Sequence, residues 1–136
     1  MKYRVRFFLE WGGGCLWPAD AAARDSLGVG PLDLRSWEAA PRLPLPEDMQ
    51  QACDALVAEH DSYLNPLYPP DPSLWSQAQC DSFNARVDAF VAALRQAMPG
   101  VEIIDQQTRY AEDPGLDAWL AANPGYTRIE PGDQAS

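Results

Sequence analysis

Two apolar stripes with helical spacing, joined by a proline-rich segment, constrain the fold of this chain more than any other feature of its sequence. The first stripe predicts a helix over 47–64, with Pro46 suited to its first turn. Asn65 ends this helix, because a residue that precedes a proline avoids the helical region. The residues of the stripe are Met49, Cys53, Leu56, Val57, His60 and Leu64.

The second stripe predicts a longer helix over 76–98. Ser76 and Gln79 form the S-x-x-Q pattern of a capping box, in which each side chain bonds the backbone of the other residue. Pro99-Gly100 then stops the helix. The residues of this stripe are Cys80, Phe83, Val87, Phe90, Val91, Leu94 and Met98.

Between the two predicted helices lies a connector, residues 65–74, that is rich in proline and therefore stiff. Aromatic and acidic side chains flank its prolines, and a stiff segment of this kind loses little entropy on binding. Either these rings contact a partner, or they cover the ends of the two helices. We predict a partner-binding surface made by Asp61, Tyr63, Tyr68, Asp71 and Trp75.

Three segments have the character of strands. Apolar and polar residues alternate over 3–11, as in a half-buried strand, and a glycine run at 12–14 then favours a tight turn. The apolar run 15–17 suits a short second strand, and 101–106 a third. The strands at 3–11 and 101–106 are expected to pair with each other.

The remaining segments predict smaller elements. A short helix is expected over 19–27 and another over 113–122, which Asp113 would cap. Residues 28–46 read as a long surface connection, and 126–129 as a short last strand. The sequence therefore predicts one α+β domain over 1–130 with a flexible tail over 131–136. Its small mixed or antiparallel sheet would have two to four strands, with two long helices on one face and short extra helices.

Charge limits the partners that the chain can bind. Twenty acids face ten bases, which gives a net charge of −10 and a pI near 4.3. Such a charge repels nucleic acids and anionic membranes, and attracts basic protein surfaces. No apolar run approaches the ~20 residues that cross a bilayer. We therefore expect no direct binding to nucleic acid and no membrane association.

The cysteines are few, odd in number and far apart: Cys15, Cys53 and Cys80. Because a closed zinc site needs close pairs of Cys or His ligands, we expect neither a metal nor a cofactor. Sparse, unpaired cysteines favour reduced thiols and a cytoplasmic protein. The first residues alternate in polarity and do not have the apolar run of a signal peptide.

A complete catalytic set is not evident, so we expect a binding protein and no enzyme. A small enzyme of unknown reaction could use Glu10, Cys15 or His60, with His60 as general base and Cys15 as its nucleophile, but the place of His60 on an apolar stripe favours a buried structural histidine. This enzyme is the alternative hypothesis. A third hypothesis is a small-molecule binding module, in which Trp11, Trp17 and Trp37 surround the glycine turn.

Several motifs carry a resemblance to a known family. The run LEWGGGCLW over 9–17, GPLDL over 30–34, His60-Asp61 and YPPDP over 68–72 resemble a family of small uncharacterised bacterial proteins. The chain is also similar in kind to the small acidic immunity proteins that accompany bacterial polymorphic toxins. This second resemblance implies a cytoplasmic inhibitor that binds a cognate toxin domain with a basic surface.

Overall fold

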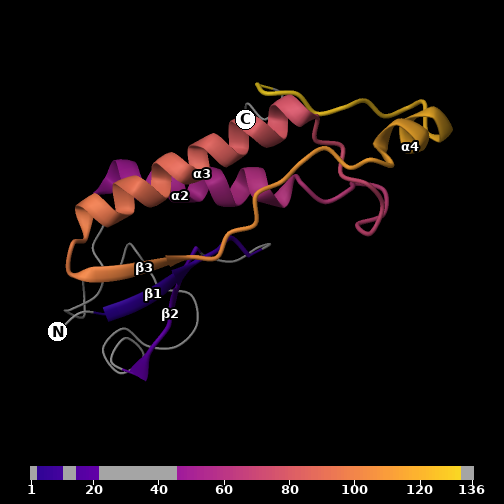
Figure 1. Ribbon diagram of the computed structural model, residues 1–136. Coiled ribbons are helices and arrows are strands. Elements are labelled where there is room, and N and C mark those ends of the chain that lie inside the picture. Colours follow the sequence, from indigo (N-terminus) through magenta and orange to yellow (C-terminus); the bar gives the residue numbers. More distant parts are fainter. Residues whose placement is uncertain (1–2, 11–14, 22–45, 133–136) are drawn as a thin grey trace.

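The computed structural model describes residues 3–10, 15–21 and 46–132, and Figure 1 shows their arrangement. Strands β1 (Tyr3–Phe7), β2 (Leu16–Pro18) and β3 (Val101–Asp105) form one sheet. The long helices α2 (Glu47–Asp61) and α3 (Gln77–Ala97) lie on the same side of this sheet, and α4 (Leu116–Ala122) lies away from it. The predicted α+β fold is confirmed.

The sheet has the order β2-β1-β3, with β1 in the middle. β1 runs antiparallel to β2 and parallel to β3, with Tyr3 opposite Val101 and Phe7 opposite Asp105. The pairing expected between the strands at 3–11 and 101–106 is therefore confirmed. Gln106 N continues the ladder by donating to Phe7 O at 2.9 Å. This pairing brings the chain just after β3 beside the chain just after β1.

The core lies between the sheet and the two helices. Val5, Phe7 and Leu9 are buried while Arg4 and Glu10 are exposed, as the alternation in the sequence predicts. The apolar stripe of α3 is buried along its whole length, and the rings of Phe7 and Phe90 are 5.8 Å apart. Burial of the two stripes against one sheet face is the main source of stability.

The ends of the helices differ in part from the prediction. α2 ends at Asp61, three residues before the predicted 64, because Ser62 N and Ser62 Oγ both donate to Glu59 O and close the last turn. Ser76 caps α3 as expected, with its Oγ accepting from Gln79 N at 3.0 Å. The second hydrogen bond of a capping box, from Ser76 N to the side chain of Gln79, is not formed. Gln79 Nε2 instead donates to Glu59 Oε2 on α2 at 2.6 Å, and Ser76 N donates to Ile129 O.

A disulfide joins Cys15, just before β2, to Cys53 on α2, with their Cα atoms 6.9 Å apart. The expectation of reduced thiols is therefore wrong for these two residues. Sequence spacing gave no sign of the pair, because folding brings the sheet edge and α2 together. Cys80 is a free cysteine and is fully buried.

The elements that follow β3 are shorter than the sequence predicts. α4 begins at Leu116, later than predicted, because Asp113 Oδ1 accepts from Gly115 N and holds a turn before the helix. The expected last strand is reduced to a single bridge between Trp75 and Ile129. The glycine turn, most of the predicted helix over 19–27, nearly all of the connection over 28–46 and most of the tail lie outside the described residues.

Candidate functional site

The connector between α2 and α3 has a fixed shape. The Asn65 side chain is almost completely buried, and its Oδ1 accepts from Leu67 N at 2.9 Å and from Tyr68 N at 3.2 Å. Asn65 Nδ2 donates to Pro72 O at 2.8 Å. One buried amide therefore holds both ends of the turn. Such a loop is already ordered before it meets a partner.

This turn presents apolar side chains to solvent. Leu67 is 55% exposed and Tyr68 is 57% exposed, and these are the large hydrophobic residues that stand out from the described surface. Single exposed apolar residues are common, but two adjacent ones on a braced turn form a compact apolar projection. Tyrosine is also frequent among the residues that dominate binding energy at protein interfaces.

Acidic groups lie on the same turn and at its start. Asp61 is exposed at the C-terminal end of α2. Asp71 N donates to Tyr68 O at 2.9 Å, and Asp71 Oδ2 accepts from Trp119 Nε1 at 3.0 Å. Asp71 is thus fixed in place by α4. We call Asp61, Leu67, Tyr68 and Asp71 the connector surface.

Two of the predicted contact residues point inward. Trp75 is 0% exposed, and its Nε1 donates to Ser62 Oγ at 3.2 Å. A partner cannot reach it, so its assignment to the partner-binding surface is wrong. Tyr63 is partly buried, with its ring 4.2 Å from that of Tyr110 and edge-on to Trp75. These two rings cover the helix ends, which was the alternative reading of the connector, whereas Tyr68 faces outward.

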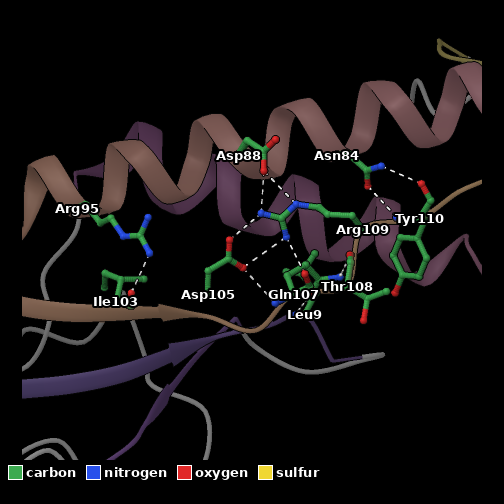
Figure 2. Close-up of polar contacts among 10 residues, drawn as sticks. All are labelled: Leu9, Asn84, Asp88, Arg95, Ile103, Asp105, Gln107, Thr108, Arg109 and Tyr110. Carbon is green, nitrogen blue, oxygen red and sulfur yellow. Dashed lines mark hydrogen bonds and ion pairs between the residues drawn. The ribbon is translucent and has the colours of Figure 1, made fainter.

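A second group of polar residues lies where the chain leaves β3, and Figure 2 shows it in close-up. Arg109 Nη2 donates to Asp88 Oδ1 on α3 at 2.7 Å and to Asp105 Oδ2 at 2.6 Å. Asn84 Oδ1 accepts from Tyr110 N, and Asn84 Nδ2 donates to Tyr110 O. The segment 105–110 is thereby tied to α3 from both ends.

The same segment is tied to the sheet. Gln107 Oε1 accepts from Leu9 N, just after β1, at 2.6 Å (Figure 2). The strand before the segment is also held, because Arg95 on α3 donates to Ile103 O of β3 at 3.0 Å. Burial raises the pKa of the Asp105 carboxyl, but hydrogen bonds from Arg109 and Gln107 N more than offset this, so the pKa is lowered overall. These contacts hold the segment in one place between the sheet and α3.

A cleft of about 280 Å³ lies between this segment, the end of β1 and the C-terminal turn of α2. His60 is 1% exposed, and its Nε2 is 2.7 Å from Tyr110 Oη. Burial lowers the pKa of His60 more than the Asp61 carboxylate raises it, and burial raises the pKa of Tyr110. Both groups are therefore neutral at pH 7. The lining residues are Phe8, Leu9, Glu10, His60, Gln106, Gln107, Thr108 and Tyr110.

The catalytic alternative is only partly assembled. Glu10 and His60 both line the cleft, but Cys15 does not, and its sulfur is bonded to Cys53. A disulfide sulfur is not a thiolate and cannot act as the proposed nucleophile. The prediction that His60 is a buried, hydrogen-bonded residue is confirmed.

The small-molecule alternative rests on three tryptophans, of which the structure describes one. The Trp17 ring stacks on Phe8 with centroids 5.0 Å apart, and its Nε1 donates to Phe8 O. Trp17 thus braces the chain after β1. Trp11, Trp37 and the glycine turn lie outside the described residues.

The described residues contain neither a metal-binding cluster nor a membrane-spanning helix. In the parts of the chain that the structure describes, no group of three His, Cys, Asp or Glu side chains is placed to hold a metal ion. No described helix is both long enough and apolar enough to cross a bilayer.

Sequence reasoning missed two residues of these sites. Leu67 was not assigned to the partner surface, although its position between Pro66 and Tyr68 in an aperiodic segment gives it no helix or strand face to bury. Tyr110 was missed because its contact with His60 joins residues fifty positions apart. No local spacing signals a pair of that kind.

Comparisons of the chain with protein-family models, with curated proteins and with solved structures found no match.

Proposed function

We propose that this chain is an acidic inhibitor of the immunity-protein kind, which binds and blocks a cognate bacterial toxin domain that has a basic surface. The observation that carries the proposal is the connector surface: Leu67 and Tyr68 are exposed on a turn that Asn65 holds in one shape. A turn that is ordered in advance and carries an aromatic anchor suits a protein partner better than a small molecule.

Charge gives the second line of support. The net charge of −10 attracts a basic cleft, such as one that binds nucleic acid or nucleotides, and speeds the encounter. Asp61 and Asp71 place carboxylates beside the apolar residues. In this proposal the acids direct the approach, and Tyr68 with Leu67 supplies most of the lasting affinity.

The compartment is part of the proposal. A toxin that acts on nucleic acid or nucleotides has its targets in the cytoplasm, so we propose that the inhibitor acts there. The Cys15–Cys53 disulfide opposes this, because such bonds persist mainly in oxidising compartments. Trapping thiols with an alkylating reagent in intact cells decides the point. Alkylation of Cys15 and Cys53 there would support cytoplasmic action, whereas their protection by the disulfide would place the protein in an oxidising compartment.

Binding to a toxin domain with a basic surface tests the function, with calorimetry as the measurement. Tyr68→Ala with Asp71→Ala should weaken binding by about 2–4 kcal/mol, as for residues that dominate an interface. Gln96→Ala, at an exposed position near the other end of α3, should change nothing. If the double variant binds as tightly as the wild type, the connector surface is not the interface.

A further inference from the structure

The cleft beside His60 has a negative character that the proposed function leaves unexplained. At neutral pH, Glu10 is the one lining residue in the described part of the chain whose side chain carries a formal charge. His60 and Tyr110 are neutral, because burial disfavours their charged forms. The carboxylate of Glu10 is exposed and therefore available to a ligand.

The rest of the lining offers hydrogen-bond acceptors. Gln106 and Thr108 are exposed, and each has a side-chain oxygen that can accept a hydrogen bond. The segment that carries them is fixed by Arg109 and Gln107 (Figure 2). The backbone from which these acceptors project is consequently held in position before any ligand arrives.

The position of the cleft in the fold adds to its negative potential. His60 belongs to the last turn of α2, and the C-terminal end of a helix carries a partial negative charge. Asp61 ends the same helix and is exposed. On the opposite wall, the Phe8 ring is held by stacking on Trp17 and provides a firm apolar surface. An alkyl stem can lie against such a surface while its charged head reaches the acceptors.

We propose that this cleft binds a single guanidinium or primary ammonium group, with Glu10 as its counter-ion and Gln106 and Thr108 as hydrogen-bond acceptors. The cleft volume of about 280 Å³ suits one such group on a short stem and is small for a larger molecule. The proposal does not depend on the connector surface or on inhibition of a toxin.

Two sources present this chemistry: the Arg or Lys side chain of a protein, and a free small cation. Methylguanidinium, free arginine and arginine blocked at both backbone ends are the probes. If the blocked arginine binds as well as the free amino acid, the ligand is a protein side chain. If free arginine binds about tenfold more tightly, the cleft takes a small molecule.

Binding is measured on the intact protein by NMR, following the side-chain amide signals of Gln106 and Gln107 during titration. We expect saturable shifts with the cationic probes and none with methylurea, which has a similar shape and no charge. Glu10→Gln should weaken binding by about fivefold or more, because it removes a charge-assisted hydrogen bond. Since Glu10 is exposed, this variant should keep the wild-type spectrum elsewhere.

Glu47→Gln is the matched control. It removes the same charge at the N-terminal end of α2, which is about 20 Å from His60 along the helix. Its affinity for the probes should equal that of the wild type. Equal weakening by both substitutions would mean that only the overall charge attracts the cation. That result, or the absence of saturable shifts in the wild type, overturns the proposal and leaves the proposed function unaffected.

Discussion

His60 shows how one buried side chain links the fold to pH. Burial lowers its pKa in the folded chain below the usual value of 6.5, with the Asp61 carboxylate acting in the opposite direction. The unfolded chain therefore binds this proton more readily than the folded chain. The contribution of His60 to stability is fully present above the unfolded pKa and is lost as the pH falls through the folded one.

We expect the free energy of unfolding to decrease as the pH falls below about 6.5, by at most about 1.4 kcal/mol per pH unit. Urea unfolding at several pH values measures this. His60→Gln removes the titrating group, so its curve should be flat over the same interval. Parallel curves for the wild type and the variant would show that His60 does not cause the decrease.

Asn84 ties the segment after β3 to α3 through two hydrogen bonds to the backbone of Tyr110. Asn84→Ala leaves both backbone groups without this partner, so the free energy of unfolding should fall by about 2 kcal/mol. Chemical denaturation gives the value. Gln96→Ala, at an exposed site on the same helix, should stay within about 0.5 kcal/mol of the wild type. A similarly small change for Asn84→Ala would contradict the role given to this residue.

At the scale of elements, the disulfide between the start of β2 and α2 closes a loop with a sequence separation of 38. Chain-entropy reasoning for a loop of this length gives a stabilisation of about 4 kcal/mol. Cys15→Ser with Cys53→Ser should therefore lower the free energy of unfolding by about 2–4 kcal/mol. Unfolding in the presence and absence of a reductant gives an independent measurement. If the reductant has no effect on the wild type, the two cysteines are not joined in solution.

Thiol counting checks the same bond and the state of Cys80. Burial raises the pKa of the Cys80 thiol to about 11, so the folded protein should not react with a thiol reagent at neutral pH. In denaturant, one thiol should react before reduction, and all three should react after it. Rapid labelling of the folded, unreduced protein would contradict the buried position of Cys80.

Helices and strands whose apolar residues recur at regular spacing could be predicted from the sequence, but the contacts between these elements could not. The stripe of α3 and the alternation in β1 follow from local spacing, so their buried faces were foreseen. Glu59 is polar and has no place in a stripe, yet it is 7% exposed because Arg86 and Gln79 bind its carboxylate. No local rule shows which distant residue will neutralise a buried charge.

At the candidate site, the connector was likewise predictable in its local character but not in its tertiary contacts. Its stiffness and its mixture of aromatic and acidic residues were evident, but proline-rich backbone has no period that assigns a side chain to one face. Trp75 was therefore expected outside and lies at 0% exposure, while Tyr68 lies outside as expected. The direction of the Trp75 ring is decided by tertiary contacts, with Ser62, Tyr63 and Phe83 among its neighbours.

At the scale of the whole molecule, the net charge of −10 should control the rate of association with a basic partner. The Debye length falls from about 30 Å at 0.01 M salt to about 8 Å at 0.15 M. We expect the association rate constant to drop by about tenfold or more over this range, while the dissociation rate changes much less. Stopped-flow measurements at several salt concentrations test this. If the association rate constant does not depend on salt concentration, electrostatic attraction does not drive the encounter.

The parallel pairing of β1 with β3 has a consequence for biosynthesis. Residues 98 positions apart must meet before the central strand has both of its neighbours. A ribosome that has not yet made Val101–Asp105 therefore carries a nascent chain in which one edge of Tyr3–Phe7 is open. An open edge with alternating apolar residues is a template for wrong pairing between chains. Slow translation just before residue 101 should for this reason lower the yield of folded protein.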